Sequence, residues 1–307
     1  EWTDGVVANT FREFASTDTP DRKWVIFDGP IDTLWIESMN TVLDDNKKLC
    51  LMSGEIIQMS NCMSLIFECM DLSQASPATV SRCGMIYLEP SNLGWRPVFR
   101  SWLNDLPDTL KKEEPLFIAL FDWLLEPSID FVHRNTKEYV PTSTNNLARS
   151  LMYFVNMFLA ENMKADTDLK HLRTWIISTV FFSLVWSVSG VVDTDGRTKF
   201  DSFIRDILSG KNEQHPYPGE VGTKLEVPFP SDGLVYDYMY DFKARGKWIH
   251  WNDTIKGATI GEGRKVQEII VPTMDTARYT YLMDISIRHK RAIMFVGPTG
   301  TGKSVYV

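Results

Sequence analysis

The sequence predicts an α/β protein in three parts: a stretch of alternating strands and helices, a mostly helical block, and a second α/β stretch. Over residues 1–90, short apolar runs alternate with turn residues, as they do in an α/β layer. Between residues 95 and 210, apolar residues recur at the i, i+3 and i+4 spacing of packed helices. After Gly263 the α/β pattern resumes, and an apolar run there leads into a glycine-rich loop.

Length, composition and charge restrict the class of protein. A chain of 307 residues can hold about two domains of roughly 100–200 residues each, with a sizeable core. With 44% hydrophobic and 23% charged residues, it is globular rather than disordered. A net charge of −8 provides no overall attraction to nucleic acid or to an anionic membrane, so neither is expected as a partner. Four cysteines without a C-x-x-C pair favour free thiols in a reducing compartment.

The ends of the sequence and one long apolar stretch bear on targeting and membrane insertion. No signal or transit segment opens the chain, which starts at Glu1 and stops at Val307 within an apolar run, so we expect part of a longer polypeptide. The stretch Trp175–Val192 has 18 residues without a charge, whereas a membrane span needs about 20 mostly apolar residues. Serine and threonine dilute this stretch, so a helix buried in the helical block is expected instead of a span.

The first α/β stretch contains clear strand, hairpin and helix signals. Residues Leu34–Leu43 have helical spacing, and Ser53-Gly54 marks the turn of a hairpin. Ser76-Pro77 begins a short helix that should end near Arg82, because serine is a favoured N-cap and proline fits the first helical position. The expected β-elements are, in chain order, the strand Trp24–Phe27, the hairpin Lys48–Met59, and the strands Ser64–Cys69 and Met85–Leu88.

Apolar periodicity and proline content also predict the elements of the helical block and of the region after it. Four prolines in His215–Asp232 rule out a helix or a central strand there, so residues 213–262 are expected to form a connector. The pattern then predicts a strand at Glu268–Val271, a helix at Asp275–His289 and a strand at Ala292–Val296. The expected helices of the block are Leu116–Leu125, Asn145–Leu159, Leu172–Val188 and Phe200–Leu208.

The glycine-rich loop is the motif with the most chemical content. Glycines let successive backbone N–H groups curve around a phosphate, the Lys303 ammonium reaches the β and γ oxygens, and the Ser304 hydroxyl ligates Mg²⁺. A glycine-rich turn with a surface lysine is the alternative. The pattern predicts a phosphate-binding loop for ATP or ADP with Mg²⁺. The sequence Gly297-Pro298-Thr299-Gly300-Thr301-Gly302-Lys303-Ser304 matches G-x-x-x-x-G-K-[ST] directly after the apolar run.

A second signal is the apolar run that ends in Asp28. In P-loop ATPases such a strand lies beside the strand of the phosphate loop, and its aspartate holds magnesium through water, although any buried strand ending in aspartate fits the pattern. In those proteins the phosphate loop comes before this aspartate, whereas here Asp28 lies far ahead of Gly297. The order therefore predicts two successive P-loop modules, with the helical block between them as a lid.

Segments between Phe27 and Met85 and between Val271 and Ser304 resemble the motor region of dynein heavy chains. Pro30 and Ser76-Pro77 are more similar to axonemal than to cytoplasmic heavy chains. The resemblance covers nearly the whole chain and is most specific at residues 24–90 and 268–305. The segments that look like the second AAA+ module are Phe27–Asp32, Trp35–Glu37, Leu43–Lys47, Ser53–Glu55 and Ser76–Met85, and those that resemble the opening of the third are Val271–Thr276 and 297–304.

The resemblance implies a P-loop AAA+ fold: a partial parallel sheet with helices, then a helical lid subdomain, then the start of a second P-loop α/β module. The implied parts are the latter part of the large α/β subdomain of the second module (1–93), the lid (94–212), the Pro-rich connector (213–262) and the start of the third module with its phosphate loop (263–307).

The resemblance also assigns roles to residues of the second module. Asp28 would be its Mg²⁺-coordinating acid. AAA+ hydrolases place a glutamate next, as the base for the attacking water, but this sequence has Gly29, so we expect nucleotide binding with little hydrolysis. Asp32 is near but should point elsewhere. Asp71 stands at the sensor position, with a role as a cap as the alternative. Arg82 matches the arginine finger of the preceding module's site, with a cation at a helix C-terminus as the alternative.

For the third module and the lid, the resemblance implies fewer residues. Val271 and Pro272 would brace the adenine next to the phosphate loop, and Arg149 is a candidate second sensor, unless it simply belongs to a solvated helix face. The parent would be an ATP-driven microtubule motor of the cytoplasm, cytoskeleton and ciliary or flagellar axoneme. Its expected partners are neighbouring AAA+ modules, dynein intermediate and light chains, and microtubules bound through parts outside this segment. The segment alone should be inactive, because neither site is complete in it.

Two other classes of function stay open at this point. One is a non-motor AAA+ ATPase that remodels or regulates a client, and the other is a non-enzymatic helical interaction module whose glycine loop is incidental. A zinc enzyme or a serine hydrolase is disfavoured, because the five histidines form no metal-binding pattern and no G-x-S-x-G motif occurs.

Overall fold

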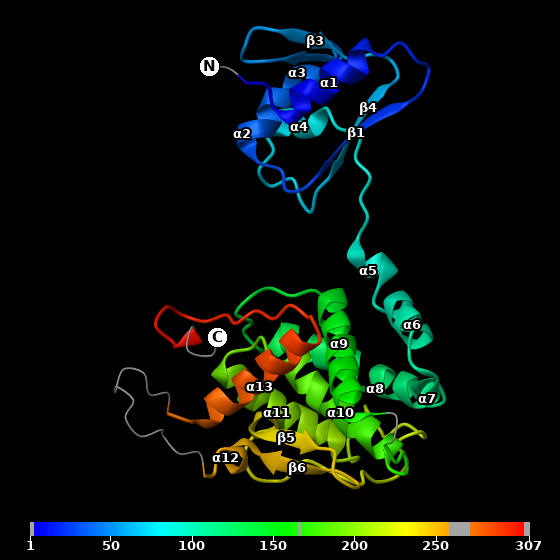
Figure 1. The fold of residues 1–307 in the computed structure, drawn as a ribbon, viewed down its shortest axis with the longest axis vertical. Helices are drawn as coiled ribbons and strands as arrows, with labels where there is room; N and C mark the ends of the chain where they lie inside the picture. Colours follow the sequence, from blue (N-terminus) through cyan, green and yellow to red (C-terminus); the bar gives the residue numbers. More distant parts are fainter. Residues whose placement is uncertain (1–2, 165–166, 258–270, 304–307) are drawn as a thin grey trace. The chain divides into compact units, whose positions relative to one another are not determined.

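A computed structural model describes residues 3–164, 167–257 and 271–303. The chain forms two compact units, Glu1–Leu88 and Glu89–Val307 (Figure 1). The first unit is mixed α/β with a parallel strand pair, and the second is mostly helical, which confirms the expected fold class.

The first unit is built around the strands β1 and β4. They pair in parallel, from Lys23 opposite Met63 to Asp28 opposite Glu68. Along β1, exposed and half-buried residues alternate, so that one face of the strand is turned toward the core. The elements of this unit are α1 (Val6–Ser16), β1 (Lys23–Asp28), α2 (Thr33–Ile36), the 3₁₀ helix η1 (Glu37–Met39), α3 (Asn40–Leu43), β2 (Lys48–Cys50), β3 (Ile56–Gln58), β4 (Met63–Glu68) and α4 (Pro77–Ser81).

The core of the first unit lies on one face of the strand pair. Phe27 of β1 stacks on Phe67 of β4, with ring centroids 4.9 Å apart, and on Trp35 of α2 at 5.7 Å. Phe11 of α1 is fully buried in a neighbouring apolar cluster that includes Leu49 and Met63. These contacts hold β1 and β4 in register, and with them the residues at their ends.

Most of the elements predicted for the first unit are confirmed. The hairpin β2–β3 is antiparallel and turns through Gly54, whose φ of +90° is a conformation that glycine adopts readily. The helix α4 begins after Ser76, whose hydroxyl accepts a hydrogen bond from the Thr79 N–H at 3.3 Å, and it ends at Ser81 with Arg82 as its C-cap.

The predicted strand Met85–Leu88 is wrong. This segment belongs to no strand, and its four side chains are 61–88% exposed. An apolar run forms a strand only when a neighbouring strand takes up its hydrogen bonds, and among the described residues none pairs with it.

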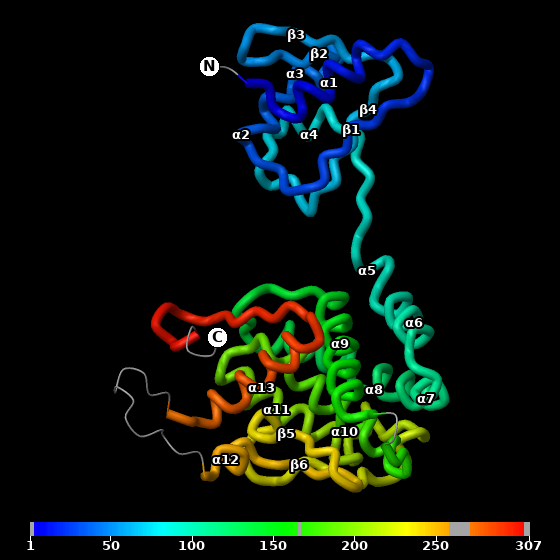
Figure 2. The backbone as a smooth tube through the Cα atoms, viewed as in Figure 1, coloured from blue at the N-terminus to red at the C-terminus, as the bar shows by residue number. Residues whose placement is uncertain are grey.

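The second unit has a large helical core. Figures 1 and 2 show α8, α9 and α10 together in this unit, with α13 alongside. The helix predictions for this region are confirmed in type and approximate position. The elements are α5 (Pro90–Leu93), α6 (Arg96–Asn104), α7 (Asp108–Lys111), α8 (Glu114–Asn135), α9 (Thr144–Asn162), α10 (Leu172–Ser187), α11 (Thr194–Leu208), η2 (Val235–Asp237), β5 (Tyr238–Asp241), β6 (Lys247–His250), α12 (Trp251–Thr254) and α13 (Met274–Arg288).

The charge-free stretch that raised the question of a membrane span is the buried helix α10. All of its residues are buried except Arg173 and Ile177. Of the helices in the described part of the chain, none combines the length and the apolarity that crossing a bilayer requires. The expectation of a buried helix is confirmed.

The aromatic core of the second unit supports a prediction about stability. The side chain of Phe121 on α8 is fully buried, and its ring lies 4.3 Å from that of Phe99 on α6. Phe121→Ala should lower the free energy of unfolding of this unit by about 3–5 kcal/mol, because it removes apolar contacts and leaves a cavity. Chemical denaturation would measure the loss. Ile118→Ala, on the same helix at 38% exposure, is the control, and equal losses would contradict this reading of the core.

The connector expected over 213–262 is corrected by the structure. The described part of this range contains the antiparallel hairpin β5–β6 and packs on the helices. Trp251 is buried and donates its indole N–H to the Tyr236 carbonyl at 3.1 Å, and Trp123 of α8 donates to the His215 carbonyl at 3.0 Å. Large aromatic side chains therefore bring this segment into the core, although its prolines keep His215–Asp232 free of regular helix and strand.

Near its end, the described chain departs from the prediction once more. The expected helix is confirmed as α13, but Ala292–Val296 is not a strand. Within the described residues, no neighbouring strand hydrogen-bonds to this segment, and the side chain of Met294 is 78% exposed. The strand expected at Glu268–Val271 lies outside the described residues except for Val271.

Candidate functional site

Two carboxylates share one edge of the first unit. Asp28 ends β1 and Glu68 ends β4. The two residues are register partners on neighbouring parallel strands, so they lie on the same face, with the strands about 4.8 Å apart. Both side chains are exposed. The ladder continues one step further, because the Gly29 N–H donates to the Glu68 carbonyl at 3.2 Å. Sequence reasoning found Asp28 and missed Glu68, whose position depends on the strand pairing.

This acidic edge has the donor chemistry of a magnesium site. Carboxylate oxygens are preferred Mg²⁺ ligands, and Mg²⁺ usually keeps several waters and takes only one or two carboxylates from the protein, with phosphate oxygens completing its shell. Within the described residues there is no group of three or more acidic, histidine or cysteine side chains that could hold a metal. Asp28 and Glu68 therefore offer two carboxylates, the number that Mg²⁺ commonly takes from a protein, and do not form a closed, protein-only metal site.

The position after Asp28 offers no base. A Cβ atom added to Gly29 would meet nothing within 4 Å, so the backbone leaves open space at that point. Asp32, the nearby acid, is the N-cap of α2, and its carboxylate accepts a hydrogen bond from the Leu34 N–H at 2.7 Å. That capping bond gives Asp32 a local structural partner.

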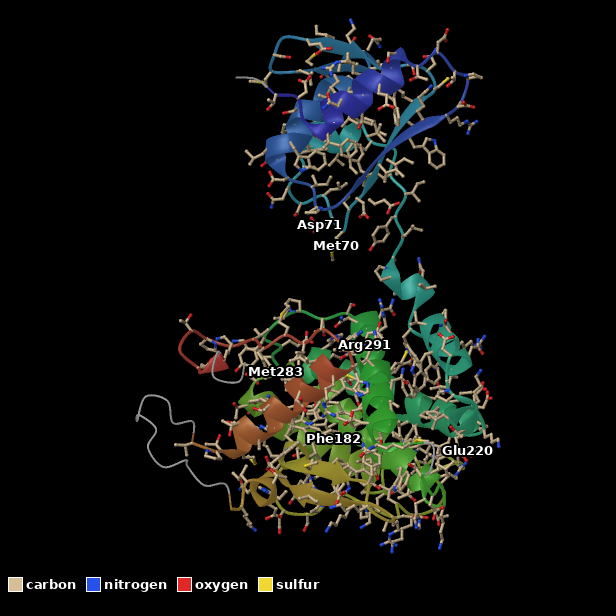
Figure 3. All side chains as sticks on the ribbon, in the orientation of Figure 1. Met70, Asp71, Phe182, Glu220, Met283 and Arg291 are labelled. Atoms are coloured by element: carbon tan, nitrogen blue, oxygen red, sulfur yellow. The ribbon has the colours of Figure 1, made fainter. Side chains whose placement is uncertain are left out.

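Asp71 lies in the loop beyond β4, where Figure 3 labels it. Its carboxylate accepts hydrogen bonds from the Ser73 hydroxyl at 2.6 Å and from the Ser73 N–H at 2.9 Å. These bonds hold the pKa of Asp71 below its usual value, the hydroxyl bond having the larger effect. The strand itself ends at Glu68, three residues earlier. This geometry is that of a loop cap, the alternative that the sequence analysis left open.

Arg82 is the C-cap residue of α4 and is held by neighbours in its own unit. Its Nε donates to the carboxylate of Asp44, and its Nη1 donates to the Ala78 carbonyl at 2.7 Å. The side chain stays 30% exposed. The sequence alone does not identify Asp44 as a partner of Arg82, because 38 residues separate the two in the chain.

A polar cluster anchors the helix that carries Arg82. Thr79 is 2% exposed, and its hydroxyl lies 2.9 Å from the Asn40 side-chain oxygen and 3.3 Å from a Glu37 carboxylate oxygen. The hydrogen bond from the Ser76 side chain is the main reason why the pKa of Glu37 is lowered. The cluster therefore joins α4 to η1 and α3 from within.

Two glycines of the glycine-rich loop have left-handed backbone conformations. Gly300 and Gly302 have φ values of +81° and +75°, which favour glycine. The Lys303 ammonium folds back over the loop and donates to the carbonyls of Gly297 at 2.9 Å and Pro298 at 2.6 Å. Ser304, the predicted hydroxyl ligand of magnesium, lies outside the described residues. In this conformation the lysine is already at the loop, bound to its backbone oxygens.

The segment that leads to this loop is tied to the helical core of the second unit. The Arg291 guanidinium lies 4.0 Å from the centre of the Tyr153 ring on α9, and Figure 3 shows Arg291 beside that helix. At the end of α13, His289 lies 3.1 Å from a Glu161 carboxylate oxygen of α9. The segment before the loop is therefore held to α9 by charged and aromatic contacts.

The remaining predicted residues take less specific positions. Val271 is 60% exposed and, with Pro272, precedes the capping box of Thr273 at the start of α13. Arg149 on α9 donates to the Tyr153 hydroxyl at 2.9 Å. Neither arrangement by itself identifies a ligand.

Two dynein family models and several axonemal dynein heavy chains match this chain. Residues 117–253 match the family model of the dynein heavy chain AAA lid domain, and residues 258–307 match that of the P-loop containing dynein motor region. The whole chain is 57% identical to dynein axonemal heavy chain 12 of Rattus norvegicus and 58% identical to that of Homo sapiens, and 99% of it is 47% identical to dynein axonemal heavy chain 3 of Homo sapiens. It spans 10% of the length of the first two and 8% of the third.

Asp28 and Lys303 lie in different compact units, and the two matched dynein regions cover the lid and the segment of the phosphate loop. Identity of 57–58% over the entire chain agrees with both matches. The chain therefore belongs to the dynein heavy chain family, as a segment of the AAA+ motor region of the axonemal type.

Proposed function

We propose that this segment contributes to two nucleotide sites of an ATP-driven axonemal motor. The observation that supports this most strongly is the order along the chain: Asp28 precedes the loop with Lys303, and residues 258–307, which hold that loop, match the P-loop containing dynein motor region. Each compact unit would carry one half of the usual P-loop site, the Mg²⁺ acid or the phosphate loop. The chain would contain the latter part of the second AAA+ module over residues 1–93, its lid over 94–212, and the start of the third module from residue 263.

In the second module, Asp28 and Glu68 would hold Mg²⁺ with a bound nucleotide. When present, the ion would neutralise charge on the phosphates and orient them. Gly29 supplies no carboxylate to accept a proton from an attacking water, and Asp32 and Asp71 are engaged as caps. The second module would therefore keep its nucleotide and hydrolyse little of it, acting as a clamp between its neighbours.

Arg82 would act on the site of the preceding module. An arginine finger stabilises the charge that develops on the transferred phosphoryl group. The position of Arg82 at the end of a helix that is anchored through the buried Thr79 suits a side chain that must be presented reproducibly to a neighbour. Its side chain is already 30% exposed, so a nucleotide phosphate can reach it without unfolding of its helix.

In the third module, the loop 297–304 would bind the phosphates of ATP or ADP, with Val271 and Pro272 near the adenine. We propose that the intact protein works in the axoneme of cilia or flagella, with the neighbouring AAA+ modules as direct partners. Intermediate and light chains and the microtubule would be bound elsewhere in the heavy chain.

Lys303→Ala tests the loop directly. The substitution should weaken nucleotide binding at the third module by about 10- to 100-fold, because it removes charge-assisted hydrogen bonds to the phosphates. Titration of the intact heavy chain with a fluorescent ATP analogue should then show one fewer high-affinity site. Lys247→Ala, which removes an exposed lysine on β6, is the matched control. An unchanged number of sites in the Lys303 variant would refute the assignment of the loop.

A further inference from the structure

The helices α3 and α4 are linked by two consecutive polar contacts. The inner contact joins Asn40 to Thr79 at 2.9 Å, and Thr79 is buried. The outer contact joins Asp44 to Arg82 one helical turn further along both helices, since Asn40 and Asp44 are four residues apart and Thr79 and Arg82 are three apart. The inner contact fixes the backbone of α4, and the outer contact holds the side chain at its end.

The outer contact leaves the arginine able to bind something else. Asp44 occupies the Nε edge of the guanidinium, and the Ala78 carbonyl takes one hydrogen of Nη1. In the described part of the chain, no acceptor takes the hydrogens of Nη2. A guanidinium held from its Nε side keeps donors for a phosphate oxygen while its rotation is restricted.

We propose that Asp44 is a positioning residue that holds Arg82 ready for the nucleotide of the preceding AAA+ module. This inference rests on the proposed role of Arg82 as an arginine finger. Asp44 itself need not touch nucleotide. An arginine that is free in solvent loses much rotamer freedom when it is fixed against a phosphate, and a carboxylate that fixes it beforehand removes part of that cost from the reaction.

The contact is poorly placed to serve only stability. The two side chains are 30% and 38% exposed, and exposed ion pairs of this kind contribute little to folding. The polar cluster around the buried Thr79 anchors α4 without them. Removing the Asp44 carboxylate should therefore change the orientation of Arg82 and leave the fold of the unit intact.

A double-mutant cycle on the intact heavy chain tests the proposal. We expect Asp44→Ala to lower kcat for ATP about 10-fold, with KM and the thermal unfolding temperature nearly unchanged. In the Arg82→Ala background the same substitution should have no further effect, since Asp44 acts only through Arg82. Asp44→Glu, which restores a carboxylate, should recover part of the loss. Asp45→Ala removes the same charge from the adjacent exposed acid and should leave kcat unchanged.

The possible results separate this inference from the function on which it rests. If Arg82→Ala leaves hydrolysis unaffected, the arginine-finger assignment fails. If Arg82→Ala abolishes hydrolysis while Asp44→Ala has no effect or raises kcat, the finger stands and the positioning role of Asp44 is refuted. An equal loss from Asp44→Ala with and without Arg82 would also refute it, because Asp44 would then act independently.

Discussion

Replacing Arg82 with alanine is expected to lower ATP hydrolysis at the preceding module's site by about 10³-fold. The side chain supplies a positive charge where negative charge develops on the transferred phosphoryl group. Among the described residues of the first unit, no other cationic side chain lies at the end of α4. The steady-state rate of ATP hydrolysis by the intact heavy chain would give the magnitude of the loss. Single-turnover experiments would give the rate of the hydrolysis step itself.

Two controls make this result specific. Arg22→Ala removes an exposed arginine of the same unit just before β1, and it should change turnover little. Arg82→Lys keeps the charge but loses the planar fork of donors, so it should recover only part of the activity. A loss of thermal stability with normal turnover in Arg82→Ala would show that the residue is a structural cation at the end of its helix.

Gly29→Glu should create turnover at the second module. A carboxylate one residue after Asp28 would provide the missing general base, and general base catalysis contributes about 10²–10⁴-fold. The structure has room for the new side chain, because a Cβ at this position meets nothing within 4 Å and the backbone is not in the left-handed region. We expect an increase of at least about 10²-fold at this site.

The measurement is cleanest in the Arg82→Ala background, where the preceding site contributes little turnover. Gly29→Gln is the matched control, since glutamine has nearly the same shape and cannot serve as a base. If glutamate and glutamine behave alike, the second module is limited by the placement of its water or by its lid, and the absent base is not the cause of its low activity.

The elements that sequence predicted well are those specified locally. The Ser76-Pro77 start of α4 depends on a cap and on the geometry of proline, and the hairpin turn at Gly54 depends on one glycine; both signals lie within a few residues. The long helices of the second unit follow from periodicity, which their buried faces confirm.

What sequence missed depends on contacts between distant segments. Met85–Leu88 and Ala292–Val296 have strand-like composition, but a strand needs a partner for its hydrogen bonds. The hairpin β5–β6 was not predicted, because the prolines before it indicate a segment without regular structure. Buried aromatic side chains such as Trp251 stabilise it. Glu68 becomes part of the site only through its register with Asp28.

For the candidate sites, motif chemistry was predictable and partners were not. Asp28 ends a strand as expected, and Gly300 and Gly302 of the loop have positive φ values, which glycine adopts readily. The pairing of Arg82 with Asp44 could not be read from the sequence, because opposite charges 38 residues apart meet only after α3 and α4 have packed.

Electron cryomicroscopy of the intact heavy chain with ATP and Mg²⁺ would test most directly whether Asp28 and the loop of Lys303 belong to separate nucleotide sites. We expect two nucleotides near this segment, one with its magnesium facing Asp28 and the other with its phosphates on the loop of Lys303. A single nucleotide that contacts both Asp28 and Lys303 would contradict the assignment of these residues to successive modules.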